Sequence, residues 1–316
     1  MKQKTVIIGG NGFIGSNLSS YLLKKNFKIR ILDKFINTKN NFTENLSEID
    51  FIECDISNTS ELINNIGDFE NIIWLVHTSV PSNSMLDLSD DLFSNLDPLI
   101  KFLSRIKDTP NIERFIFLSS GGTIYGDPKE FKPIVEDHSI NPISNYGLTK
   151  YTQEKYIHLI LKQSNIDTYI LRPANVYGPN QNLNKPQGII GHALKAAIND
   201  HPISLFNNGQ IIRDFLFADD LSAAIHKCLI ASIDSSSIES YNLGSEVGIS
   251  IQEIIEIIRN ITQKELNLIL KPPRPFDCAY NVLDSSKFKA ISNWEAKTTI
   301  DEGIMKVYKW IVNTNI

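Results

Sequence analysis

Short apolar runs alternate with longer amphipathic stretches along the first half of the chain. The apolar runs are rich in Val, Ile, Leu and Phe, which is typical of parallel strands covered on both faces. They lie at residues 5–8, 28–32, 50–54, 72–76, 115–118 and 168–171. The stretches between them include residues 60–66, 90–107 and about 147–164, where apolar positions recur at helical spacing. Six strands alternating with helices predict a doubly wound parallel sheet.

The regular alternation ends after residue 172. Further helices are predicted at residues 188–199, 219–231 and 250–260, the last with a serine cap. A short strand is predicted at residues 203–206, a flexible polar loop at 232–237 and a strand end at 241–244. We therefore predict an α/β fold, with a Rossmann-type domain over residues 1–172 and a smaller α/β substrate lobe over mainly residues 173–316. A segment near residues 212–245 is expected to return to the first domain.

Composition narrows the class of protein. The chain has 316 residues, 42% of them hydrophobic, and a net charge of −5 without basic runs, so nucleic acid is not the expected partner. Cys54, Cys228 and Cys278 lie far apart without CxxC spacing, so we expect reduced thiols and no metal site. Because there is neither a signal-peptide pattern nor a long uncharged apolar segment, we expect a cytoplasmic protein without membrane contact.

A glycine-rich loop, residues 9–15, follows the first predicted strand and precedes a helix. Gly9, Gly12 and Gly15 permit a tight turn, the close approach of a phosphate and close helix packing. The helix N-terminus offers free N–H groups to an anion. Strand, glycine loop and helix in this order predict a dinucleotide site.

Asp33 follows the second predicted strand, about 20 residues past the glycine loop. An acid there is placed to bind the ribose hydroxyls of adenosine, and its charge would repel a 2′-phosphate, which favours NAD over NADP. Arg30 and Lys34 weaken that preference a little. Asp55 and Ile56, after the third strand, look placed to touch the adenine.

Tyr146 and Lys150 are four residues apart near a predicted helix start, with Ser144 or Asn145 as its cap, and so share one face. A nearby cation favours the phenolate, so we predict a lowered pKa for Tyr146 and proton exchange with an alcohol. Residues 119–126 would bring hydroxyls and glycines to the same cleft. His77 is a second candidate base, although a structural role at a strand end is favoured. The alternative of an accidental YxxxK pattern on a surface helix stays open here.

These features resemble the extended short-chain dehydrogenase/reductase family, and within it the nucleotide-sugar epimerase and dehydratase group, closest to the UDP-glucose 4-epimerases. The resemblance runs from residue 5 to about residue 310. The matching motifs, in chain order, are residues 9–15, Asp33 with Asn37 and Thr38, Asp55-Ile56, Asn95, residues 119–126, Tyr146 with Lys150, residues 171–179, Arg213-Asp214, residues 242–245, Arg274 with Asp277, and residues 284–287.

The resemblance implies NAD as cofactor and a nucleotide sugar, most simply a UDP-hexose, as substrate. Tyr146 would be the acid–base group, and Lys150 would hold the nicotinamide ribose. The residues implied for the cofactor are Gly9, Gly12, Phe13, Ile14, Gly15, Asp33, Asn37, Thr38, Asp55, Ile56, Val76, Thr78, Ser79, Asn95, Ser119, Tyr146, Lys150 and Pro173. The residues implied for the substrate are Ser120, Thr123, Asn175, Arg213, Arg274 and Asn281.

The chain departs from the family pattern at Gly121, where epimerases carry the Ser or Thr that binds the reacting hydroxyl. Thr123 is the nearest hydroxyl in register and is assigned that catalytic role, with Ser120 and Ser79 as weaker candidates. Dehydratase relatives place an acidic pair in this loop. The chain has Gly122 and Thr123 there, which disfavours dehydration.

The resemblance therefore implies NAD-dependent 4-epimerisation of a nucleotide hexose through a transient 4-keto sugar. A 4-ketosugar reductase of deoxysugar synthesis and an inactive NAD-bound regulatory protein remain as alternatives. Family members are commonly homodimers, here through residues 90–107 and 147–164. Asn281 takes the place of a residue that lines the pocket around C2 of the hexose, and its small size would admit an N-acetylated sugar.

Overall fold

The computed structural model describes residues 3–35, 46–79, 88–184, 188–231, 238–274 and 278–314. Asn37 and Thr38, and the flexible loop predicted at residues 232–237, lie outside these ranges.

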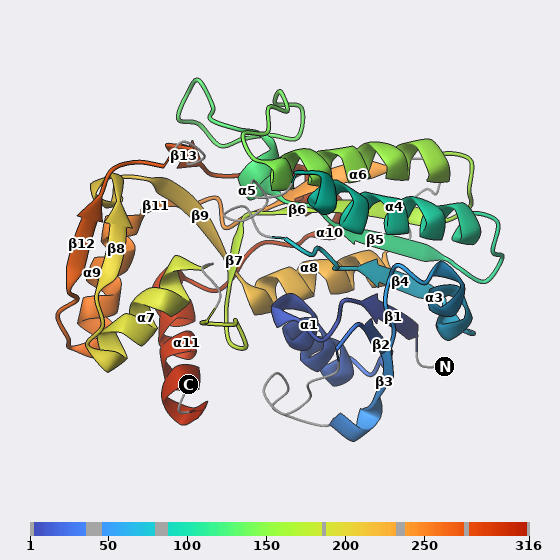
Figure 1. The fold of residues 1–316 in the computed structure, drawn as a ribbon, viewed down its shortest axis with the longest axis horizontal. Coiled ribbons are helices and arrows are strands. Elements are labelled where there is room, and N and C mark those ends of the chain that lie inside the picture. Colours follow the sequence, from blue (N-terminus) through green and yellow to red (C-terminus); the bar gives the residue numbers. More distant parts are fainter. Residues whose placement is uncertain are drawn as a thin grey trace.

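A seven-stranded parallel sheet forms the centre of the larger part (Figure 1). Its strands are β1 (Lys4–Ile8), β2 (Lys28–Asp33), β3 (Ile49–Glu53), β4 (Asn71–Trp74), β5 (Arg114–Leu118), β6 (Asp167–Pro173) and β10 (Glu239–Leu243). Their order is β10-β6-β5-β4-β1-β2-β3. The order reverses between β1 and β4, and ligands of such sheets bind beyond the carboxyl ends of the strands at this point. The predicted fold class is thus confirmed.

Helices cover both faces of the sheet, because alternate residues of each strand point to opposite sides. Ile7 of β1 joins a core with α1 (Phe13–Lys24) and α8 (Ala218–Ile230). Val6 and Ile8 join a second core with α3 (Thr59–Ile66), α4 (Leu88–Ile106) and α6 (Asn145–Leu161). Figure 1 shows α4 and α6 side by side on their face of the sheet.

The smaller part has its own core, formed mainly by residues of α7 (Ile189–Asn199), β9 (Ile212–Phe217), α9 (Ile251–Thr262) and α11 (Ile300–Thr314). In its sheets β11 (Gly248–Ser250), β9 and β13 (Tyr280–Asn281) lie in that order, β7 (Asn175–Tyr177) pairs with β9, and β8 (Ile203–Phe206) pairs with β12 (Leu268–Lys271). Ser250 caps α9 in a capping box with Glu253, which confirms the predicted serine cap.

Three predicted details change. β4 ends at Trp74 rather than residue 76, so Val76 lies just past the strand. α6 starts two residues earlier than predicted, because the Ser144 side chain accepts the Gly147 N–H and caps the helix. Of the segment 212–245 that was expected to return to the first domain, β10 joins β6 as a seventh strand, while β9 lies in the smaller part. The assignment of cofactor and substrate to the two parts stays a prediction.

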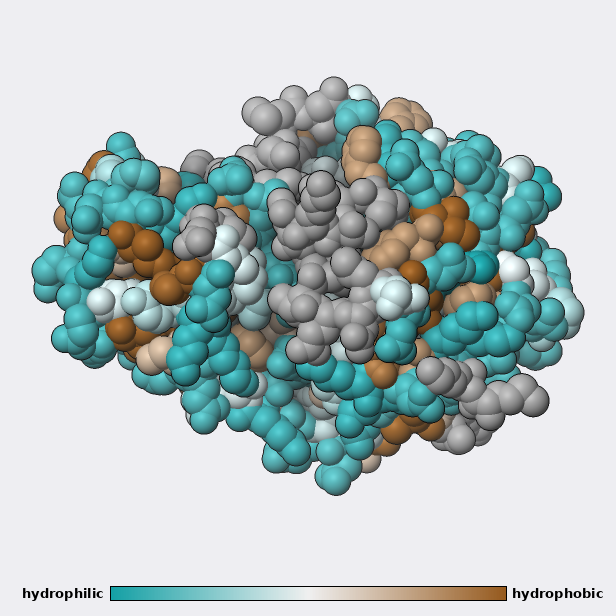
Figure 2. Space-filling view, turned by 90° about the horizontal axis from the view of Figure 1, so that it is seen from below, coloured by the Kyte–Doolittle hydropathy of each residue, from teal (hydrophilic) through white to brown (hydrophobic). Residues whose placement is uncertain are grey.

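The helices of the smaller part are amphipathic. In α9, Ile254, Ile255 and Ile258 are buried while Gln252 and Glu256 are exposed. On the face shown in Figure 2, hydrophilic residues make up most of the coloured surface, with hydrophobic residues in smaller groups between them. Within the described ranges, no helix has both the length and the apolar composition needed to cross a bilayer.

Candidate functional site

The chain leaves β5 through Ser119 and Ser120 and enters the short helix α5 (Gly121–Ile124). A Cβ atom at Gly121 would lie 2.5 Å from Leu283 Cδ1 and 2.8 Å from the Arg172 carbonyl oxygen, so no side chain fits there. The Thr123 hydroxyl oxygen is buried and has no hydrogen-bond partner among the described residues. A buried hydroxyl without a hydrogen-bond partner lowers the stability of the fold, so we expect this group to bind a ligand.

The first turn of α6 packs directly on α5. A Cβ atom at Gly147 would lie 2.6 Å from the Thr123 carbonyl oxygen, so glycine is what permits this approach. Tyr146 precedes Gly147, and its phenol forms a hydrogen bond with the Ser120 side chain. The two elements therefore bring Tyr146, Ser120 and the residue Thr123 together.

Burial dominates the acid–base properties of the pair on α6. It raises the pKa of Tyr146 to about 12, against the lowering effect of the Ser120 hydrogen bond, and the charge of Asp91 raises it further. The predicted lowering of this pKa by Lys150 is wrong for the protein alone, because desolvation outweighs any favourable charge. Tyr146 is thus a protonated acid at neutral pH.

Lys150 is also buried, with 2% of its surface exposed. Its Nζ donates to the Leu118 carbonyl oxygen at 2.7 Å and lies 4.8 Å from the centre of the Phe117 ring. Burial lowers its pKa to about 7, while the charges of Glu154 and Asp91 raise it. A lysine poised near neutrality can donate hydrogen bonds and exchange a proton.

The glycine loop fits the pyrophosphate of a dinucleotide. Gly9 has a φ of +81°, and a Cβ atom at Gly15 would lie 2.4 Å from the Gly10 carbonyl oxygen, so the fold itself requires both glycines. A Cβ atom at Gly12 would meet only the Gly9 carbonyl oxygen, at an ordinary 3.6 Å. Gly12 is the N-cap of α1 and offers no capping side chain, which leaves the helix N-terminus open to an anion.

Asp33 lies at the end of β2, where its Oδ2 accepts the Asn11 N–H at 3.0 Å, and burial raises its pKa. The neighbouring cations are both paired: Lys34 lies 2.9 Å from Asp55 and Arg30 lies 2.6 Å from Asp50. Their predicted weakening of the preference for NAD is therefore reduced, since each charge is balanced locally.

The segment after β4 is held by Asn95 of α4. Asn95 Oδ1 accepts the Thr78 N–H at 2.8 Å, and its Nδ2 donates to the Thr78 hydroxyl at 2.9 Å. The two predicted cofactor residues thus bind each other, and direct contact of either with NAD stays a prediction. Ser79 donates to Asp91, a buried carboxylate that the sequence reasoning missed. Its place one helical turn before Asn95 on α4 was the available signal.

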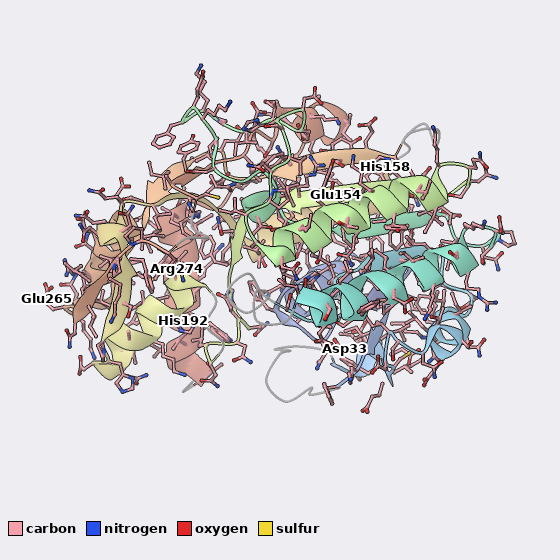
Figure 3. All side chains as sticks on the ribbon, turned by 45° about the horizontal axis from the view of Figure 1, so that its top comes forward. Asp33, Glu154, His158, His192, Glu265 and Arg274 are labelled. Atoms are coloured by element: carbon pink, nitrogen blue, oxygen red, sulfur yellow. The ribbon has the colours of Figure 1, made fainter. Side chains whose placement is uncertain are left out.

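A second buried carboxylate that the sequence did not indicate lies one helical turn after Lys150. Glu154 of α6 accepts from Ser119 and forms an ion pair with Arg172 at 2.6 Å, with both side chains under 10% exposed. Figure 3 shows Glu154 and His158 on α6. The signal was the spacing of four residues between Lys150 and Glu154. The Ser119 hydroxyl already binds Glu154, so contact of Ser119 with NAD stays a prediction.

Two predicted substrate residues flank α5. Asn281 Nδ2 donates to the Gly121 carbonyl oxygen at 3.1 Å, and Asn175 Oδ1 would lie 3.7 Å from a Cβ atom at Gly122. The two arginines lie in the smaller part: Arg213 is on β9, and Arg274 stacks over the Phe206 ring at 4.4 Å. Figure 3 shows Arg274 near His192 on the side of the molecule away from Asp33.

The remaining predicted residues line the carboxyl end of the large sheet. Phe13 and Ile14 form the first turn of α1, Ile56 follows β3, Val76 contacts Gly9, and Pro173 ends β6. Among the described residues no cluster of metal-ligating side chains occurs.

Comparison with known proteins gives the family. The sequence pattern of the NAD dependent epimerase/dehydratase family matches residues 5–244. A putative UDP-glucose 4-epimerase of Methanocaldococcus jannaschii is 29% identical, over 98% of this chain and 99% of that protein. A dTDP-4-dehydro-6-deoxyglucose reductase of Escherichia coli is also 29% identical, over 98% of each chain.

Solved structures with a similar fold are also known. The crystal structure of a UDP-glucose 4-epimerase with UDP-glucose from Thermotoga maritima superposes with a TM-score of 0.90 at 26% identity, over 99% of this chain and 100% of that one. Since the family pattern spans most of the chain and the glycine loop, Asp33, Tyr146 and Lys150 are all in place, the protein belongs to the NAD-dependent epimerase/dehydratase family.

Proposed function

We propose that the protein is a 4-epimerase of a nucleotide hexose, most simply a UDP-hexose, and that it acts through a transient 4-keto sugar. The contact of the Tyr146 phenol with the Ser120 hydroxyl carries this proposal. Thr123, whose hydroxyl has no partner among the described residues, lies on α5 where its backbone packs on Gly147. The name of the M. jannaschii relative and that of the T. maritima structure support it.

In this proposal each residue has a defined role. Tyr146 is the acid–base group on the sugar O4. Its pKa is high in the protein alone, and with NAD bound the positive nicotinamide ring and Lys150 would favour the phenolate, which takes the O4 proton and later returns it. Thr123 would donate a hydrogen bond to the same oxygen. Lys150 and Asp33 would hold the ribose groups of NAD, with the glycine loop at its pyrophosphate. Bound NAD would supply the hydride acceptor and donor at C4. Asn175, Arg213 and Arg274 would hold the nucleotide diphosphate, since guanidinium groups bind such anions with paired donors.

The 4-ketosugar reductase remains a second candidate, because the E. coli reductase is as similar as the M. jannaschii relative. The two differ in how they keep their cofactor. An epimerase regenerates NAD within each turnover and should retain it through purification, whereas a reductase must exchange it. Denaturing the purified protein and measuring released nicotinamide therefore separates them.

Turnover of UDP-glucose completes the test. Near-stoichiometric NAD together with epimerisation supports the proposal, and an empty protein that needs added NAD(P)H supports the reductase. Retained NAD without turnover of any nucleotide sugar indicates the inactive regulatory protein. Tyr146→Phe should retain NAD and lose nearly all turnover, since the binding contacts survive and the proton route does not. A loss of only a few-fold would contradict the role of Tyr146.

The same proposal includes a homodimer formed through α4 and α6, working in the cytoplasm. These helices touch each other through Gln153, which donates to the Asn95 carbonyl oxygen. Both expose large apolar side chains: Leu88, Leu92, Phe93, Leu148 and Leu159. Exposed apolar groups on adjacent helices favour a protein partner, and a second copy would bury them. Light scattering should give twice the chain mass, and a Phe93→Glu/Leu159→Glu variant should give the monomer.

A further inference from the structure

Asp91 is a buried carboxylate that has no part in the proposed reaction. It lies in the first turns of α4, and 3% of its surface is exposed. A buried charge is costly unless it is paired and hydrogen-bonded, so its partners show what it holds in place.

The partners come from three separate elements. From α6, Thr149 donates its hydroxyl to Asp91 Oδ2 at 2.7 Å and Asn145 donates its amide to the same oxygen at 3.1 Å. From the segment after β4, Ser79 donates its hydroxyl to Oδ1. From α4 itself, Asn95 donates its amide to Oδ1 at 3.3 Å. Asp91 thus joins α4, α6 and the exit of β4.

The two partners on α6 are the immediate neighbours of the proposed reactive pair. Asn145 precedes Tyr146 and Thr149 precedes Lys150. A displacement of either neighbour therefore moves a reactive group. Since misplacing such groups by about 1 Å can cost on the order of 10²-fold in rate, this anchor is well placed to matter.

His77 adds a contact to Tyr146 from the other side. Its Nε2 lies 3.5 Å from Asp91 Oδ1, and its ring lies edge-on to the Tyr146 ring with centres 4.5 Å apart. Burial lowers the pKa of His77 to about 4, aided by Lys150, so its ring is neutral and acts by packing at neutral pH. This agrees with the structural role predicted for His77.

We propose that Asp91 is a positioning residue for Tyr146 and Lys150: it fixes the first turn of α6 through Asn145 and Thr149, and its charge faces both groups. Only the kinetic test of this positioning role rests on the proposed function.

The charge gives this role a measurable signature. Tyr146 faces Asp91, His77 and Ser120. Lys150 faces Asp91, Glu154 and His77. The negative charge of Asp91 raises the pKa of Tyr146 and that of Lys150. A substitution that removes the charge of Asp91 but keeps its shape should lower both pKa values. The same substitution of a structural carboxylate elsewhere should leave both pKa values unchanged.

The first experiment compares Asp91→Asn with Asp220→Asn. Asp220 is a buried carboxylate on α8 that accepts the Thr298 N–H and lies on the other face of the sheet. Asp91→Asn should lower kcat for epimerisation on the order of 10²-fold with little change in KM. Both limbs of its pH profile of kcat/KM should move to lower pH, and those of Asp220→Asn should stay in place. Limbs at the wild-type positions in Asp91→Asn overturn the proposal.

A second measurement needs no activity. The ring ¹³C signal of Tyr146, assigned with Tyr146→Phe, reports its ionisation. At each alkaline pH where both proteins stay folded, Asp91→Asn should contain more phenolate than wild type, and an equal or smaller fraction overturns the proposal. A wild-type protein without epimerase activity defeats the proposed function but leaves this measurement valid.

Thr149 keeps the proposal testable should Asp91→Asn fail to fold. Thr149→Val removes one hydrogen bond to Asp91, and kcat should fall about tenfold. Thr149→Ser keeps the hydroxyl and should retain the wild-type rate. Equal rates in the two variants contradict an anchor at Asp91.

Discussion

At the residue scale, the space around Gly121 decides where a catalytic hydroxyl can stand. Leu283 and the Arg172 backbone fill the volume that a serine side chain would need. The hydroxyl of Thr123, by contrast, is buried and has no partner among the described residues. Packing therefore excludes a side chain at residue 121, and Thr123 as the replacement donor stays a prediction.

Thr123→Ala should reduce epimerisation on the order of 10²-fold, which is typical of losing one transition-state hydrogen bond. Stability should hardly change, because no hydrogen bond inside the described protein is lost. The matched control is Ser120→Ala, which removes the hydrogen bond to Tyr146 but leaves the Thr123 hydroxyl. A Thr123→Ala enzyme near the wild-type rate, beside a crippled Ser120→Ala enzyme, would show that Ser120 is the donor instead.

Asp33 is expected to set the choice between NAD and NADP. Asp33→Ala should weaken NAD binding about tenfold and relax the bias against NADP, since a ribose ligand and a repelling charge are lost together. Adding Asp55→Asn releases Lys34 from its ion pair and should improve NADP binding further. Asp68→Asn, which unpairs Lys4 at the opposite end of β1, is the control and should change neither affinity. Calorimetric titration with both cofactors measures the effect, and unchanged discrimination in Asp33→Ala excludes Asp33 as the ribose ligand.

Much of this site follows from residue types and spacing, but its electrostatics do not. The glycine loop, Asp33, Tyr146 and Lys150 stand in recognisable local contexts. The pKa of Tyr146 depends instead on burial by distant segments, which no local pattern reports. The sequence pattern does not indicate the role of Asp91 either, because its partner Thr149 is 58 residues away in the chain.

At the element scale, the long apolar runs predict their strands because burial on both faces leaves few polar positions. β10 was harder to predict, since Glu239, Ser240 and Asn242 interrupt its apolar pattern. It pairs with β6, where Tyr241 and Leu243 are buried, so tertiary context outweighs local composition.

The contact between α5 and α6 gives a prediction at this scale. Alanine is a better helix former than glycine by about 1 kcal/mol, so Gly147→Ala would favour an isolated α6. In the fold its Cβ meets the Thr123 backbone, so the first turn of α6 must move. We expect kcat to fall on the order of 10²-fold while most of the fold survives. Thr152→Ala, at a half-buried position of the same helix, should leave the rate unchanged. Wild-type kinetics in Gly147→Ala would show that the placement of this turn does not limit catalysis.

At the scale of the whole molecule, Asp214 ties segments of both parts together. Its carboxylate accepts from the Ser245 hydroxyl at 2.7 Å and from the Leu283 N–H at 3.3 Å, and it starts from β9. This junction brings the end of β10, the segment after β13 and the smaller part to one point. Sequence spacing could not predict the junction, because it joins positions up to 69 residues apart.

The buried Asp214 should make stability depend on pH in the acid range. Burial raises its folded pKa from 3.8 to about 6 against the lowering effect of its hydrogen bonds. Between these values the folded state binds more protons than the unfolded state, so this group's contribution to the free energy of unfolding falls as pH rises. It is fully present below pH 3.8 and lost above about pH 6. Urea unfolding measures the free energy of unfolding across this pH range, which should fall with rising pH more steeply in wild type than in Asp214→Asn. The same dependence on pH in the two proteins would contradict the prediction.

The last prediction concerns the choice of sugar, which we expect to depend on Asn281 where β13 meets α5. Asn281 of β13 is 1% exposed, its amide holds the Gly121 carbonyl, and its Oδ1 has no hydrogen-bond partner among the described residues. We expect a small residue beside the proposed catalytic loop to admit a C2 acetamido group, because an amide can hydrogen-bond such a group. We therefore expect the wild-type protein to epimerise UDP-N-acetylglucosamine as well as UDP-glucose. Asn281→Tyr should lower kcat/KM for the acetylated sugar on the order of 10²-fold relative to UDP-glucose, because the larger ring fills that space. Asn281→Ser also loses the amide that holds Gly121 but adds no bulk, so it separates the two effects: it should keep the wild-type preference even where its overall rate falls. The same preference in wild type and Asn281→Tyr would show that residue 281 does not select the sugar.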